Sequence, residues 1–167
     1  MTVIPDKAAF QNSLAALGVV TYQPGESLIA DGSKTGRLLI LKKGTVAIEK
    51  EGREIAKVSE PGAVFGELSL LLDRPHTADV RVLETSQFHV ANAAALVDQN
   101  PIAVLYIAKM LAHRLDDANH ALLQLKSQLQ AGEPHSVVAK TVNKIQGLLA
   151  VSGPSLVYAG YPHDPFA

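Results

Sequence analysis

The stretch Phe65-Gly66-Glu67-Leu68-Ser69-Leu70-Leu71, followed by Arg74-Pro75-His76-Thr77-Ala78, decides how the rest of the sequence is interpreted. Gly66 and Glu67 open one expected helical turn, and Pro75 makes the chain leave it, because proline cannot continue a helix. Amides at the start of a helix lack intrahelical partners, and glycine lets an anion approach the backbone closely. The Glu67 carboxylate can accept hydrogen bonds from a diol. Many loops begin a helix with Gly-Glu, so the stretch indicates an anion site only together with its surroundings.

Short β-rich runs separated by turn residues lie on both sides of this stretch. Such a rhythm is typical of a small barrel or roll of antiparallel strands, which we expect over residues 19–90. A short helix, with apolar residues at helical spacing, is expected before it from about residue 6 to residue 19. The expected strands are Val19–Tyr22, Ser27–Ala30, Arg37–Leu41, Thr45–Lys50, Glu54–Val58, Thr77–Leu83 and Thr85–Val90.

Helical patterns follow the expected roll. An Ala/Leu/Val-rich helix is predicted over residues 91–98, and Asn100-Pro101 begins a long helix that ends near Gln130. Apolar residues of the long helix alternate in steps of four and three, as in a coiled coil. They are Val104, Ala108, Leu111, Leu115, Ala118, Leu122, Leu125 and Leu129. Beyond Leu115 this helix should outrun a small roll, so we expect a homodimer through residues 104–129. The alternative is that the first part of the seam packs on the roll alone.

The remaining residues, 131–167, hold one more amphipathic segment and a Gly/Pro/Tyr-rich tail. Val138, Val142, Ile145 and Leu149 share one helical face, which would cap the roll, pack on the long helix or bind a protein partner. Residues 153–167 are expected to be irregular. We therefore divide the chain into one domain over residues 1–130 and a C-terminal segment.

Composition excludes several classes of protein. Hydrophobic residues make up 47% of the chain and charged residues 19%, which is typical of a globular protein. No apolar run approaches the roughly 20 residues of a membrane-spanning helix. The absence of cysteine and of a signal-peptide pattern favours a cytoplasmic location. A net charge of −1 gives no broad positive field for nucleic acid.

Candidate catalytic and metal sites are not supported by their context. No nucleophile elbow, phosphate loop or zinc-protease motif is present. His113, Asp116, Asp117 and His120 have helical spacing for a metal site, but the heptad seam places both histidines on the opposite, solvated face. We therefore predict no enzyme activity, no metal and no cofactor.

Four motifs, in this order, resemble the cyclic nucleotide-binding domain family, and the resemblance extends from about Phe10 to Gln130. It implies a mainly β fold with α-helices: a jelly-roll-like β-roll with a short N-terminal helix, a cassette helix turn and a long C-terminal helix. The motifs are Tyr22-x-Pro24-Gly25-Glu26-x-Leu28-Ile29, Leu39-Ile40-Leu41-x-x-Gly44-x-Val46, Phe65-Gly66-Glu67-Leu68-Ser69-Leu70-Leu71 and Arg74-Pro75-x-Thr77-Ala78-x-Val80.

The resemblance also implies a ligand, cyclic AMP or cyclic GMP, and a phosphate-binding cassette. Backbone amides around Gly66 to Ser69 would meet the phosphate, and Glu67 would accept the ribose 2′-hydroxyl. Threonine at position 77 can contact a guanine base, although strand propensity also explains it. Asn119 falls where adenine is contacted across the dimer, although an exposed helical asparagine is common. The complete predicted set is Phe65, Gly66, Glu67, Leu68, Ser69, His76, Thr77, Ala78 and Asn119.

One position departs from the family pattern. The arginine that neutralises the phosphate would directly follow Pro75, and this chain has His76 there. A permanently charged guanidinium is thus replaced by a group that is mostly neutral near pH 7. Three interpretations stay open: weak binding by a His76 that becomes protonated against the phosphate, recognition of a different small anion, or a cassette kept only as scaffold.

The predicted function is a standalone regulatory module that senses a cyclic nucleotide. The rival prediction is a protein-interaction or structural module with an unoccupied cassette. The segment after Gln130 holds one helix and few basic residues, so we expect no DNA-binding domain of the kind found in related transcription factors.

Overall fold

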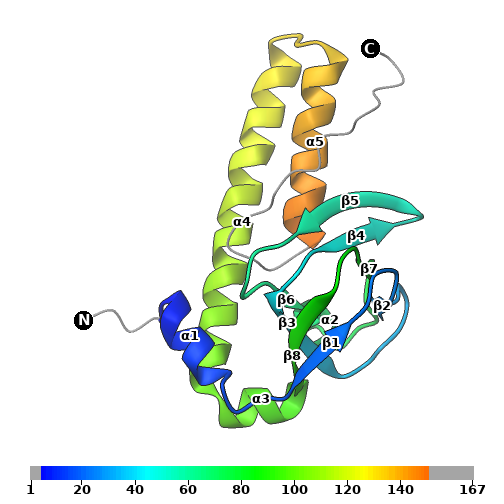
Figure 1. Cartoon of the computed structure of the whole chain (residues 1–167). Coiled ribbons are helices and arrows are strands. Elements are labelled where there is room, and N and C mark those ends of the chain that lie inside the picture. The colour runs from blue at the N-terminus through cyan, green and yellow to red at the C-terminus, as the bar shows by residue number, and fades with distance from the viewer. Residues whose placement is uncertain (1–4, 151–167) are drawn as a thin grey trace.

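The computed structural model describes residues 5–150, which form a β-roll with helices along one side (Figure 1). Within these residues, strands form two antiparallel sheets in the orders β1-β8-β3-β6 and β2-β7-β4-β5. The strands are β1 (Val19–Tyr22), β2 (Ser27–Ile29), β3 (Arg37–Lys43), β4 (Val46–Lys50), β5 (Arg53–Val58), β6 (Val64–Phe65), β7 (Asp79–Val82) and β8 (Ser86–Asn92). The predicted fold class is confirmed, and β6 is the one strand that the pattern did not predict.

Helices precede, interrupt and follow the roll. They are α1 (Lys7–Ser13), α2 (Glu67–Leu71), α3 (Ala93–Gln99), α4 (Pro101–Gln130) and α5 (His135–Ala150). Asn100 caps α4 through a side-chain bond from the Ala103 amide (3.0 Å), and Pro101 at the first helical position needs no partner for its nitrogen. The long helix therefore begins at the residue that the sequence predicted.

Two apolar clusters hold these elements together. One fills the space between the two sheets, with Phe88 at its centre and Phe65 against it at a ring-centroid distance of 6.1 Å. The other joins the roll to α1, α3 and α4, where the rings of Phe10 and Tyr106 stack 4.0 Å apart. The first half of α4 is thus fixed to the roll.

The buried stripe of α4 is displaced from the predicted seam. Its members are Ala103, Tyr106, Ile107, Met110, Arg114, Ala118 and Ala121, so Ala118 alone is shared with the predicted set. The seam residues Leu115, Leu122 and Leu129 are instead 62%, 50% and 62% exposed. The buried face packs Tyr106 on Phe10 and brings Arg114 to Glu67, whereas the pairing of the seam with a second copy stays a prediction.

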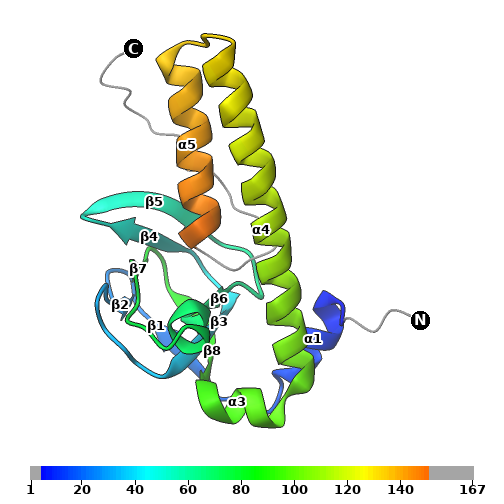
Figure 2. The same cartoon turned by 180° about the vertical axis from the view of Figure 1, so that it is seen from behind.

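The second half of α4 packs against α5, which runs antiparallel to it and returns toward β5 (Figures 1 and 2). Gly132, with a φ of 67°, closes α4 in the left-handed conformation that glycine tolerates. Buried Thr141 donates a hydrogen bond to the Gln128 side chain at 2.8 Å. Of the three alternatives for this segment, the structure shows packing on the long helix; Val142, expected on the buried face, is 37% exposed.

Two further predictions concern the C-terminal tail and membrane-spanning helices. The predicted irregular tail over residues 153–167 lies outside the described residues. Within residues 5–150, no helix combines the length and the apolar character needed to cross a membrane.

Candidate functional site

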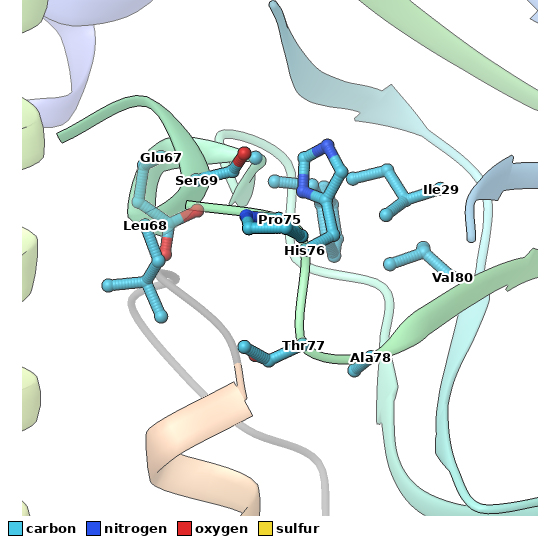
Figure 3. Close-up of a pocket in the computed structure, with 11 residues that line it drawn as sticks. Ile29, Glu67, Leu68, Ser69, Pro75, His76, Thr77, Ala78 and Val80 are labelled. Atoms are coloured by element: carbon cyan, nitrogen blue, oxygen red, sulfur yellow. The ribbon is translucent and has the colours of Figure 1, made fainter. Parts of the chain in front are cut away.

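A pocket lies between α2 and the segment that leads into β7 (Figure 3). It encloses about 410 Å³ of space that no atom fills, a volume that includes open solvent. The predicted residues of the cassette motifs all line it, whereas Asn119 does not. The lining residues are Ile29, Phe65, Gly66, Glu67, Leu68, Ser69, Pro75, His76, Thr77, Ala78 and Val80.

Strand pairing brings the two halves of the pocket together. Leu39 of β3 pairs with Phe65 of β6, which places the start of α2 beside β3. Ile29 of β2 pairs with Val80 of β7, which forms the opposite wall. Segments distant in the sequence therefore meet at one hollow because the two sheets close over their shared core.

Gly66 is required by the backbone at the start of α2. Its φ is 95°, and a Cβ atom there would lie 2.6 Å from the Arg37 carbonyl oxygen. A side chain would both strain the backbone and clash with β3. The close approach holds the first amides of α2 at the floor of the pocket, where an anion can reach them.

Ser69 and Arg74 close the loop after α2. The buried Ser69 hydroxyl donates to the Arg74 carbonyl oxygen at 2.6 Å, and the Arg74 amide donates to the Ser69 carbonyl at 3.2 Å. The Ser69 side chain is therefore used to shape the cassette. Arg74 itself is exposed and does not line the pocket.

Glu67 carries the formal negative charge of the pocket and is buried. Arg114 of α4 donates from Nη1 to Glu67 Oε1 at 3.3 Å, and the two side chains are only 10% and 5% exposed. A buried carboxylate is costly unless a partner compensates it, and Arg114 supplies that partner. The pair joins the cassette directly to the long helix.

Sequence reasoning missed Arg114 as a site residue. The available signal was an arginine in an otherwise apolar helical stripe. A charged side chain at such a position needs a buried partner.

His76 is buried, with 8% of its surface exposed. Its amide donates to the Ser33 carbonyl (2.8 Å), its carbonyl accepts from Gly32 (2.9 Å), and its ring Nε2 lies 3.1 Å from Thr35 Oγ1. Burial lowers the pKa of the His76 imidazole below its usual value, because desolvation disfavours the charged form. No lysine or arginine lines the pocket as described. The site thus presents a neutral ring where the family pattern has a cation.

The other predicted residues differ in how they meet the pocket. The Phe65 side chain belongs to the core between the sheets, so mainly its backbone can face a ligand. Thr77 is exposed at the pocket rim, and Ala78 packs partly on the core. Asn119 is exposed on α4 outside the lining residues.

Comparison with known proteins gives the family. Residues 19–99 match the model of the cyclic nucleotide-binding domain. These residues belong to the cyclic nucleotide-binding domain family. The resemblance seen in the motifs is thereby confirmed, and the pocket occupies the segment that carried it.

Relatives and solved structures agree with this family. The chain is 33% identical over 104 residues to a cGMP-dependent protein kinase of Toxoplasma gondii, covering 60% of the chain and 10% of the kinase. Its fold is similar to the catabolite activator protein of Thermus thermophilus, with a TM-score of 0.59, 22% identity, and coverage of 87% of this chain and 84% of that protein. It is also similar to cAMP-bound PfPKA-R, with a TM-score of 0.50, 20% identity and coverage of 73% and 39%. The chain spans 7–10% of the length of the kinases that it matches.

Proposed function

We propose that this chain is a regulatory module that binds cyclic AMP or cyclic GMP in the pocket between α2 and β7. The observation that carries the proposal is the geometry of the cassette. Gly66 lets the start of α2 lie close to β3, and the next residue, Glu67, has a buried carboxylate that Arg114 orients. The similar structure of PfPKA-R is cAMP-bound, and the similar kinases are cGMP-dependent, so both nucleotides are candidates.

The proposed pose places the phosphate between the two halves of the pocket and the ribose on the α2 side. The phosphate lies against the backbone amides from Gly66 to Ser69 and beside the His76 ring. The ribose 2′-hydroxyl donates to Glu67, since a carboxylate can accept several hydrogen bonds and stay bonded to Arg114. The base lies toward Thr77 at the open rim.

Affinity should be modest, because the phosphate meets no cation among the lining residues. Charge-assisted contacts in buried sites are worth roughly 2–5 kcal/mol, which His76 in its neutral form does not supply. That His76 becomes protonated against the phosphate stays a prediction, and burial, which lowers the pKa of the ring, opposes it.

The output would pass through α4. A ligand that bonds to Glu67 changes the contact that Glu67 makes with Arg114, and Arg114 belongs to the helix that joins the roll to α5. Such a ligand moves that helix only by its difference in affinity between the two arrangements. Weak binding then also limits how far the ligand can shift the position of α4.

Calorimetric titration with cyclic AMP and with cyclic GMP tests this function. We expect saturable binding with a dissociation constant of about 1 mM or tighter, since a few well-placed hydrogen bonds are worth about 4 kcal/mol. Glu67→Ala should weaken it and Thr85→Val, which alters an exposed residue outside the lining, should leave it unchanged. Absence of heat from either nucleotide at millimolar concentration would reject the sensor function.

A homodimer through α4 is a second proposal, favoured by the exposed stripe on that helix. Leu115, Leu122 and Leu129 follow one another at heptad spacing on a face that α5 does not cover. Asn119 lies one turn after Leu115 on the same face, so a second copy would bring it toward the partner's bound base. This arrangement keeps the proposed role of Asn119 in adenine contact.

Sedimentation of a double variant, Leu115→Glu with Leu122→Glu, tests the dimer. We expect a monomer, because the two charges would replace apolar side chains at the seam. Leu123→Glu is the matched control, since Leu123 is 66% exposed but lies off the heptad seam. A wild-type monomer, or equal effects of the seam and control variants, would contradict pairing. In the rival function, an unoccupied cassette, these surfaces and residues 131–167 meet a protein partner instead.

A further inference from the structure

The His76 ring is held by a residue outside the lining of the pocket. Thr35, just before β3, lies with its Oγ1 atom 3.1 Å from His76 Nε2. The same oxygen accepts a hydrogen bond from the Arg37 amide at 3.3 Å. His76 Cε1 is 3.5 Å from the position that a Cβ atom on Gly66 would take. The ring thus lies close to both the β2–β3 loop and the start of α2.

The contact with Thr35 bears on which ring nitrogen carries the proton. A threonine hydroxyl has one proton to donate and two lone pairs that accept. The Arg37 amide takes one lone pair, so the hydroxyl can donate to His76 Nε2 or accept from it with the other lone pair. A neutral imidazole has one donor and one acceptor nitrogen, so donation from Thr35 to Nε2 would leave Nδ1 as the donor.

The Nδ1 atom is available to a ligand. Among residues 5–150, no group forms a hydrogen bond with it, and it is not one of the buried atoms without a partner. Figure 3 shows the ring beside Pro75, with Ser69 of the cassette to one side and Ile29 to the other. An N–H at this position borders the space that the phosphate would occupy.

We propose that Thr35 is a positioning residue that holds His76 in the Nδ1–H tautomer, so that the ring donates a hydrogen bond to the ligand phosphate. In the opposite tautomer, the Nδ1 lone pair would face the phosphate oxygens and repel them. Thr35 therefore decides whether a neutral His76 attracts or repels an anion. This inference rests on the proposed function for its ligand, but the tautomer is a property of the unliganded chain.

Nitrogen NMR of the histidine rings in the full chain tests the tautomer directly. The spectrum is recorded near pH 8, where a histidine of ordinary or lowered pKa is neutral. We expect the proton of the His76 ring on Nδ1 in the wild type and in Thr35→Ser, and a shift toward the Nε2–H form in Thr35→Val. A wild-type ring protonated at Nε2 would overturn the proposal.

Calorimetry of the same variants tests the consequence for cyclic AMP and cyclic GMP. Thr35→Val should weaken binding about 3- to 10-fold, the range of one neutral hydrogen bond, and Thr35→Ser should stay within about twofold. In a His76→Arg background the Thr35→Val effect should disappear, because a guanidinium has no tautomer to fix. An equal loss in both backgrounds would show that Thr35 only supports the loop.

The two experiments separate the two proposals. A wild-type chain that binds neither nucleotide rejects the proposed function, and the NMR spectrum still decides whether Thr35 sets the tautomer. A chain that binds nucleotide with His76 protonated at Nε2 keeps the function and rejects the positioning role.

Discussion

The two halves of the pocket differ in the partners of their buried polar side chains. On the α2 side, the buried Glu67 carboxylate pairs with Arg114 of the long helix. On the β7 side, His76 is a ring whose pKa burial lowers, held within the roll by Thr35. One half is therefore coupled to the helices by charge, and the other is neutral and local.

In the proposed function, this difference separates ligand binding from transmission. The half that holds His76 offers the phosphate no cation, so it would limit affinity. The half that holds Glu67 contacts α4 directly through Arg114, so it would provide a route from the pocket to the helical hairpin. We therefore expect weak binding without loss of the connection to α4.

The largest effect is expected from Arg114→Ala, which removes the cation of the buried ion pair with Glu67. Removing one member of a buried ion pair leaves the other uncompensated, so we expect a loss of about 3 kcal/mol in the free energy of unfolding. Chemical denaturation monitored by circular dichroism measures it. Adding Glu67→Gln to this variant should recover part of the loss, because the unpaired charge is then removed.

Arg81→Ala provides the matched control for that variant. Arg81 pairs with Glu49 at 3.4 Å, but its side chain is 47% exposed, so the cost should be within about 0.5 kcal/mol. Equal losses for Arg114 and Arg81 would mean that the Glu67 contact is no stronger than a surface pair, and the contrast between the two halves would fail.

The next effect is expected from His76→Arg, which would make the neutral half charged. A guanidinium beside the phosphate should tighten cyclic nucleotide binding about 30-fold, the lower end of the range for a buried charge-assisted contact. His76→Gln keeps the site neutral and is the control. Affinity that is unchanged or weaker in His76→Arg would assign the weakness to site geometry rather than to charge.

The smallest effect is expected in the pH dependence of stability. Burial lowers the pKa of His76 and His89, and the His89 Nδ1 atom is buried without a partner among the described residues. The unfolded chain then binds protons more readily than the folded chain. The free energy of unfolding is therefore highest above about pH 6.5 and falls as the pH drops below it. Nearby Lys42 lowers the pKa of His89 further, while a backbone hydrogen bond with Leu17 opposes the shift.

Thermal melting between pH 8 and pH 5 measures this dependence. The double variant His76→Gln with His89→Gln should lose less stability on acidification than the wild type. An identical pH profile in the double variant would show that neither ring titrates differently on folding, and the neutral character of the His76 half would lose its support.

Local patterns in the sequence determined the fold and most of the pocket. Turn residues and β-rich runs located the strands to within a few residues, and Asn100-Pro101 located the start of α4, because caps and turns depend on neighbouring residues. Glycine, glutamate and proline at fixed spacing indicated the cassette. The substitution at His76 was also visible without any structure.

Contacts between distant segments were decided by the tertiary structure. Arg114 pairs with Glu67 across 47 positions, and Thr35 contacts His76 across 41 positions. No local pattern specifies such pairings. The heptad spacing was visible in the sequence, whereas the packing of Tyr106 on Phe10 decided which face of the first half of α4 is buried and which leucines stay exposed. The sequence alone thus determined that a nucleotide-type cassette is present, and packing decided which of its polar groups are charged, neutral or linked to the helices.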